Sequence, residues 1–160
     1  MTPAKILSRT LPSTVTATTI VSSQLTVQTP GAGFTDLTVE VAKFLRSAGA
    51  REGAATLFIR HTSASLTIQE NADPTVLDDL MTALQRVAPE NAGWRHDTEG
   101  PDDMPAHIKT MLTATSLLIP VLDGELALGT WQAIYLIEHR ARPHQREIVL
   151  QFIGGSVSTQ

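Results

Sequence analysis

The chain of 160 residues contains no cysteine, and this absence removes several classes of site at once. Without a thiol there is no disulfide scaffold, no zinc finger, no iron–sulfur cluster and no cysteine nucleophile. A metal ion bound by this chain must therefore be held by imidazole nitrogen and carboxylate oxygen. Five histidines and sixteen acidic residues are present to supply such ligands.

Aromatic residues, excess positive charge and long apolar runs are also scarce. Aromatics make up 4% of the residues and the formal net charge is −4, which argues against a surface for nucleic acid or for an anionic membrane. No apolar run approaches the roughly 20 residues of a membrane span. The Thr-rich stretch over residues 1–21 lacks the pattern of a signal peptide. We therefore expect a cytoplasmic protein with neither nucleic-acid nor membrane partners.

The apolar patterns predict about seven or eight short strands and two main helices. Alternation predicts strands near 22–28, 54–60, 63–69, 116–121, 125–128, 134–139 and 147–153. Helical spacing predicts helices over 36–48 and 74–87, the second capped by Asp73. Because the strands outnumber the helices and do not alternate with them, we expect an α+β fold with a largely antiparallel β-sandwich. Residues 22–160 are expected to form a single domain, preceded by an N-terminal leader or extra edge strand over 1–21.

One long segment, 88–109, has no sustained period and carries His96 and His107 among many acids. A structureless segment of this length in a compact domain is usually functional or disordered. With His61, which follows a predicted strand, the two histidines offer three imidazoles, enough to hold a divalent metal and leave a position open. Imidazole with carboxylate suits Zn, Ni, Fe or Mn, whereas Mg favours oxygen ligands alone. The structural alternative is a solvated acidic loop with incidental histidines.

An arginine-rich loop between the last two predicted strands forms a second candidate. It carries Arg140, Arg142 and Arg146. Guanidinium groups bind phosphate in a bidentate manner, so the loop is expected to grip a phosphorylated substrate. A charged turn that keeps a sheet edge soluble is the alternative.

Four stretches taken together resemble the YjbQ-like family, whose members carry the label secondary thiamine-phosphate synthase. They are HTSASLTIQENADPTVLDDL (61–80), HDTEGPDDMPAHIK (96–109), LLIPVLDGELALGTWQAIYLIEHR (117–140) and the closing REIVLQF. The resemblance covers about residues 22–155. It implies an α+β sandwich that assembles as a homotrimer, with pockets at the subunit boundaries. It also implies a metal-compatible cluster that maps onto His61, His96 and His107.

The resemblance further implies an enzyme that joins a pyrimidine methyl diphosphate to a thiazole phosphate and releases pyrophosphate. The expected catalytic residues are His61, His107 and Glu138. The residues expected to bind substrate are Thr62, Ser63, Glu70, Asn71, Lys109, Trp131, Gln132, Arg140, Arg142 and Arg146. Two other functions stay open: a metal-dependent enzyme for another small phosphorylated metabolite, and a non-catalytic trimeric protein that binds a metal or ligand. The stretch from Pro101 to Pro105 departs from the family, in which many members are Asn-rich at this point.

Overall fold

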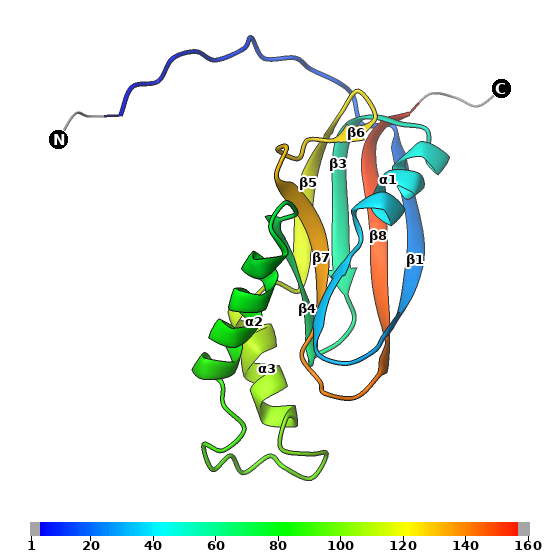
Figure 1. The fold of residues 1–160 in the computed structure, drawn as a ribbon. Coiled ribbons are helices and arrows are strands. Elements are labelled where there is room, and N and C mark those ends of the chain that lie inside the picture. Colours follow the sequence, from blue (N-terminus) through cyan, green and yellow to red (C-terminus); the bar gives the residue numbers. More distant parts are fainter. Residues whose placement is uncertain (1–3, 157–160) are drawn as a thin grey trace.

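The computed structural model describes residues 4–156, which form two antiparallel sheets and three helices (Figure 1). In chain order the elements are β1 (Thr19–Thr29), β2 (Gly33–Asp36), α1 (Thr38–Ser47), β3 (Ala50–Ile59), β4 (Ala64–Glu70), α2 (Pro74–Val87), α3 (Asp103–Leu112), β5 (Ser116–Leu122), β6 (Glu125–Leu126), β7 (Gln132–Glu138) and β8 (His144–Ser156). The larger sheet has the strand order β1-β8-β3-β5-β6, and the smaller one has the order β2-β7-β4. The predicted α+β fold with antiparallel sheets is confirmed.

The core lies between the two sheets, and burial alternates along the strands for that reason. Leu57 and Ile59 of β3 are buried, whereas Phe58 between them is 48% exposed. The same alternation places Ile119 and Val121 of β5 inward. The buried cluster draws on both sheets and on α1, and consists of Leu37, Val41, Leu57, Ile59, Ala64, Leu66, Ile119, Ile134, Leu136, Ile148 and Leu150.

The first helix is shorter than the predicted 36–48, because a short strand occupies its predicted start. Asp36 ends β2, and its side-chain Oδ1 accepts a hydrogen bond from the backbone N of Thr38 at 2.8 Å. Strand β2 spans four residues, too few to show an alternating pattern in the sequence. The sequence therefore assigns part of this strand to the helix.

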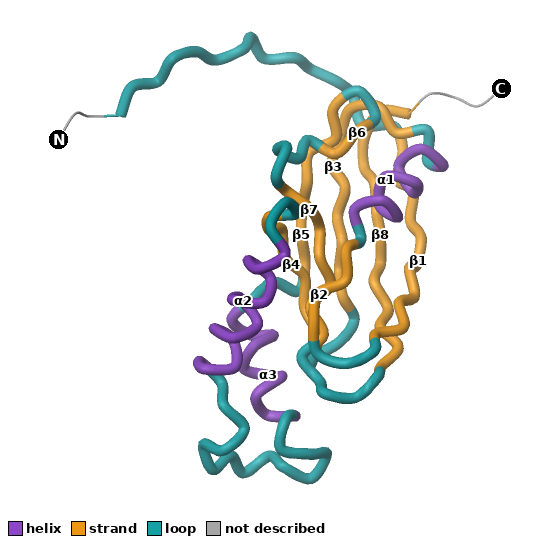
Figure 2. Tube along the Cα trace, viewed as in Figure 1, coloured by secondary structure: helices purple, strands orange, loops and turns teal. Residues whose placement is uncertain are grey.

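The second helix has the predicted bounds, and its cap is the predicted one. Asp73 stands at the N-cap of α2 and accepts a hydrogen bond from the backbone N of Thr75 at 2.9 Å, with Pro74 in the first turn. In Figure 2 the helices α2 and α3 lie at one end of the molecule, joined by the loop over residues 88–102. The loop and α3 carry most of the candidate site.

The segment 88–109 is only partly irregular, which corrects the prediction of one long loop. Helix α3 begins at Asp103 and so occupies the last part of this segment. Pro105 lies in the first turn of α3, where a missing N–H costs nothing because that turn has no carbonyl partner. Proline therefore makes the start of α3 look irregular in the sequence, although it does not prevent the helix from forming.

The segment before β1 has no regular structure over residues 4–18 and extends away from the sheets in Figure 1. Strand β1 begins at Thr19, three residues before the predicted strand, and it lies at the edge of the larger sheet against β8. No helix within residues 4–156 is both long and apolar enough to span a membrane.

Candidate metal centre

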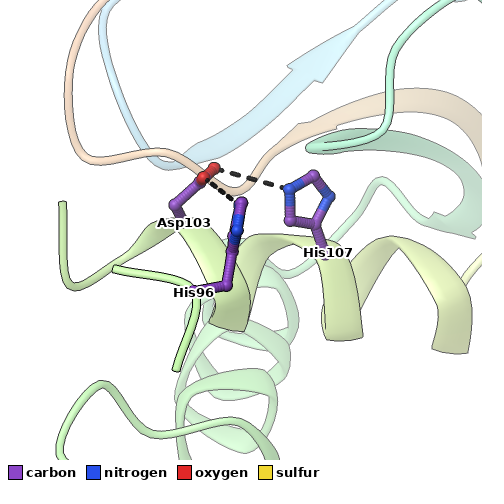
Figure 3. A group of neighbouring side chains, drawn as sticks. All are labelled: His96, Asp103 and His107. Carbon is purple, nitrogen blue, oxygen red and sulfur yellow. Dashed lines mark ion pairs between the residues drawn. The ribbon is translucent and has the colours of Figure 1, made fainter. Parts of the chain in front are cut away.

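Two histidines and one aspartate converge at the start of α3 (Figure 3). One ligand atom from each of His96, Asp103 and His107 lies within 4.8 Å of the other two. His96 Nε2 lies 2.8 Å from Asp103 Oδ2, and His107 Nε2 lies 3.7 Å from Asp103 Oδ1. Asp103 and His107 share one face of α3 because they are four residues apart. His96 reaches them from the preceding loop.

The orientation of His107 is set by a carbonyl group on another segment. Its Nδ1 lies 2.9 Å from the backbone oxygen of Thr62. A carbonyl oxygen only accepts, so Nδ1 is the protonated nitrogen, and in the neutral ring Nε2 keeps a lone pair on the side of Asp103. This is the arrangement in which a histidine serves as a metal ligand, because the hydrogen bond at the second nitrogen fixes the tautomer and the ring.

Asp103 is held from behind by a buried arginine. The side chain of Asp103 is 3% exposed, and its Oδ1 accepts a hydrogen bond from Arg140 Nη1. Arg140 also donates from Nε to Asp102 Oδ2 at 3.0 Å and from Nη2 to the backbone oxygen of Glu99 at 2.8 Å. Burial opposes the charge of Arg140, but the hydrogen bond and charge of Asp102 and the charge of Asp103 raise its pKa. Arg140 thus carries its charge toward carboxylates of its own chain and does not present it to a phosphate.

His61 does not join this group among the described residues. Its Nε2 accepts a hydrogen bond from the backbone N of Glu147 at 2.8 Å. Burial lowers the pKa of His61, and the charge of Arg146 lowers it further, which favours the neutral ring. A neutral ring that accepts at Nε2 carries its proton on Nδ1 and has no lone pair left for a metal. Within residues 4–156 the structure thus brings His96 and His107 together with Asp103 and places His61 elsewhere.

Glu138, predicted as catalytic, is buried in an ion pair and is 1% exposed. Its Oε1 lies 2.6 Å from Arg146 Nη2 and its Oε2 lies 2.7 Å from Arg146 Nε. Thr29 Oγ1 and the backbone N of Arg140 donate to the same carboxylate. Burial opposes its charge, but these hydrogen bonds, above all those from Arg146, lower the pKa of Glu138. A carboxylate with both oxygens so occupied joins β7 to β8 and is not placed to exchange protons with a substrate.

Four other residues predicted to bind substrate lie at the opposite end of β4 and β7. Glu70 pairs with Gln132 across the two strands, and the backbone N of Asn71 donates to the oxygen of Trp131 at 3.1 Å. Thr62, which contacts His107, precedes the other end of β4. A seven-residue strand is about 20 Å long, so these four residues do not converge with His96, Asp103 and His107 within one chain. Arg142 is exposed, whereas Arg140 and Arg146 are buried.

Two buried residues of the site carry no sequence signal of their own. Asp103 is one acid among several in the sequence around it, although its spacing to His107 would single it out once α3 is known.

His139 is 2% exposed and binds Ser65 Oγ through Nε2 at 2.8 Å. Burial lowers the pKa of His139 to about 4, with the charge of Lys109 as the second cause. Lys109 is 7% exposed, and burial lowers its pKa as well. His139 and Lys109 line a depression of about 550 Å³ between α2 and α3.

Comparison with known proteins places the chain among close relatives. Residues 23–155 match the family model described as UPF0047 protein YjbQ-like. The UPF0047 protein sll1880 of Synechocystis is 48% identical over 131 residues, which cover 81% of this chain and 89% of that protein. The UPF0047 protein YjbQ of Salmonella typhimurium is 49% identical over 102 residues, which cover 64% of this chain and 74% of that protein.

Solved structures agree with the fold over nearly the same range. A YjbQ/UPF0047 family protein from Clostridium acetobutylicum has a TM-score of 0.74 at 36% identity, covering 82% of this chain and 98% of that one. The hypothetical protein APE1520 from Aeropyrum pernix has a TM-score of 0.78 at 26% identity, covering 84% of this chain and 99% of that one.

Proposed function

Since the chain belongs to the YjbQ-like UPF0047 family, we propose that it is a divalent-metal enzyme for a small phosphorylated metabolite. The ligands in this proposal are His96, Asp103 and His107. The observation that carries it is the fixed tautomer of His107, whose Nδ1 is bound to the Thr62 carbonyl while Nε2 is directed toward a buried carboxylate and a second imidazole. Incidental histidines on a solvated loop have no reason to share such an arrangement.

The donor set suits the proposed ion. Two imidazoles and one carboxylate are three protein ligands, which leave coordination positions for a substrate. Zn, Ni, Fe and Mn accept this mixture, whereas Mg is less favoured. A bound ion of this kind supplies Lewis-acid polarisation of a phosphoryl oxygen. Arg140 supports the set from behind, because it holds Oδ1 of Asp103 and leaves Oδ2 on the side of His96.

The reaction in this proposal follows from the sequence resemblance described above. A thiazole ring nitrogen forms a bond to the methylene carbon of a pyrimidine methyl diphosphate, and the carbon–oxygen bond to the diphosphate breaks. Thiamine phosphate and pyrophosphate are the products. The leaving diphosphate needs cations close to the metal centre, and Arg60 and Arg146 flank the Thr62–Ser63 segment that contacts His107. These positions support a phosphorylated substrate.

We propose further that the chain forms the homotrimer that the resemblance implies, through the outer face of the larger sheet. Leu118 and Leu122 of β5 are 71% and 56% exposed, and Ile153 of β8 and Phe58 of β3 are 40% and 48% exposed. The strand register places Leu118 beside Thr56 of β3, and these side chains face away from the smaller sheet. An apolar face of this kind on neighbouring strands is typical of a protein–protein interface.

The test is a coupled assay for thiamine phosphate with purified protein, the two phosphorylated substrates and a chelator. The expected wild-type activity falls to background after chelation and returns when Zn or Mn is added. Asp103→Asn is expected to stay inactive under both conditions, because a neutral amide is a poor ligand and also loses the ion pair with Arg140. Full activity in the presence of the chelator would contradict the proposal. Metal binding without formation of thiamine phosphate would support the metal centre and reject the thiamine reaction, so that another phosphorylated substrate would have to be sought.

A further inference from the structure

A second depression adjoins the proposed metal centre on the other side of the Thr62–Ser63 segment. Its volume is about 580 Å³, and it lies where β3 ends, between the segment 60–63 and the first part of β8. Arg60, His61 and Arg146 line it. Thr62 belongs to its wall as well, and the carbonyl of the same residue binds His107.

Arg146 is the buried base of this depression, with only 4% of its surface exposed. Its Nε and Nη2 donate to Glu138, and Nη2 also donates to Ser63 Oγ at 3.1 Å. Nη1 has no hydrogen-bond partner within residues 4–156. A guanidinium group that uses one edge on a buried carboxylate and keeps another nitrogen free still has donors for a second anion.

His61 adds a neutral donor to the same depression. Since its Nε2 accepts the backbone N–H of Glu147, its ring proton resides on Nδ1. This Nδ1–H also has no partner in the part of the chain that the structure describes. The unmatched groups of His61 and Arg146 are therefore both donors, and neither is among the buried polar atoms without a partner, so each is open to an acceptor from solution.

Two carboxylates lie close enough to oppose an anion, and they differ in availability. Glu138 is fully occupied by hydrogen bonds on the buried side of Arg146. Glu147 is partly exposed and pairs with Arg60, with 3.2 Å between Oε2 and Nη1. An incoming anion therefore competes with Glu147 alone for a cationic partner, and by displacing that carboxylate it would form an ion pair with Arg60.

We infer that the depression bounded by Arg60, His61 and Arg146 binds a tetrahedral oxyanion, with donors from His61 Nδ1, Arg146 Nη1 and Arg60. The assignment of this anion to the phosphoryl group of the substrate rests on the proposed function. The anion site itself uses none of the metal ligands. It differs from the phosphate-binding loop predicted from Arg140, Arg142 and Arg146, of which only Arg146 lines this depression.

The experiment is a titration of metal-free, chelator-treated protein with inorganic phosphate at constant ionic strength, followed by NMR of the side-chain ¹⁵N–H groups. We expect saturable binding, with a Kd below about 10 mM, and movement of the His61 Nδ1 and Arg146 Nη1 resonances. Arg60→Gln is expected to weaken binding roughly threefold, the size of effect that an exposed charge pair gives. Glu147→Gln is expected to tighten it by a similar factor, because the competing carboxylate is removed.

Arg142→Gln is the matched control, since it removes the same charge from an exposed position of the loop before β8. It is expected to bind phosphate as the wild type does. Equal effects of Arg60→Gln and Arg142→Gln on the Kd for phosphate would show that phosphate responds only to the overall charge of the protein, and would overturn the inference. So would the absence of any shift at His61 and Arg146. Phosphate binding that survives chelation, together with failure of the metal-dependent assay, would keep this site and reject the proposed function.

Discussion

Acid should destabilise this protein through His139 before it titrates the carboxylates. His139 is 2% exposed, and burial lowers its pKa to about 4 from the ordinary value of 6.5, with help from the charge of Lys109. Its Nε2 binds Ser65 Oγ at 2.8 Å, Thr113 Oγ1 lies 2.6 Å from that hydroxyl, and the same Oγ1 lies 2.7 Å from the oxygen of Lys109. Since that carbonyl only accepts, the hydrogens run from His139 through Ser65 and Thr113 to Lys109. Nδ1 is buried without a partner among the described residues, so a second proton placed there would have no acceptor, and burial with the charge of Lys109 favours the neutral imidazole.

The size and sign of the effect follow from the two pKa values. Between pH 6.5 and about 4 the unfolded chain binds a proton at this residue and the folded chain does not. The stability that His139 contributes is therefore complete above pH 6.5 and is lost as pH falls toward 4. At about pH 5, where unfolded Asp and Glu remain mostly ionised, the loss relative to pH 7 is about 2 kcal/mol. His61 has a pKa shifted in the same direction and adds to the loss in the same window.

Urea unfolding of the wild type and of His139→Gln at these two pH values measures the contribution. Glutamine keeps a group that can bond to Ser65 but has no proton to titrate in this range. The variant is expected to lose about 2 kcal/mol less free energy of unfolding than the wild type when the pH is lowered. The comparison cancels the part due to His61 and to the other histidines. Parallel losses in both proteins would refute the assignment of a neutral, buried His139.

Three substitutions, the first with Gly129→Ala as its control, test other parts of the structure. Gly154→Ala places a methyl group against the backbone of Glu52 and is expected to cost at least about 2 kcal/mol in urea unfolding, whereas Gly129→Ala, with room for the methyl group, costs under about 1 kcal/mol. Asp73→Ala removes the cap of α2 and is expected to lower the free energy of unfolding by about 1 kcal/mol. The helical circular dichroism signal is expected to fall as the first turn of the helix frays. Leu118→Lys places a charge on the proposed trimer face and is expected to yield monomers in analytical ultracentrifugation; an unchanged trimer would exclude that face.

The strands could be predicted because alternation records burial directly. Leu57 and Ile59 face the core and Phe58 faces outward, and the sequence shows this period without any knowledge of their partners. Helix α3 was harder to predict, because Pro105 reads as a break when its place in the first turn is unknown. The four residues of β2 are too short for a period to appear. Local sequence thus predicts elements well where length and periodicity allow it.

The candidate site depended more on contacts between distant segments. His96 and His107 were predicted to lie together, and the structure brings them together on and beside α3. The hydrogen bond between His61 and the backbone of Glu147 joins residues 86 positions apart, and no local pattern announces it. The ion pairs of Arg140 and Arg146 with carboxylates have the same long-range origin. Residue type indicated possible ligands, but only tertiary pairing shows which of them keep a free lone pair or donor.

Metal binding by matched histidine variants tests the central claim most directly. Zinc titration by isothermal calorimetry, with elemental analysis of the dialysed samples, would compare the wild type with His107→Gln and His61→Gln. We expect one zinc per chain in the wild type and in His61→Gln, because His61 uses its Nε2 on Glu147. His107→Gln is expected to bind at least about tenfold more weakly. Loss of zinc in His61→Gln with retention in His107→Gln, or no zinc in the wild type, would contradict the assignment of His96, Asp103 and His107 as the metal ligands.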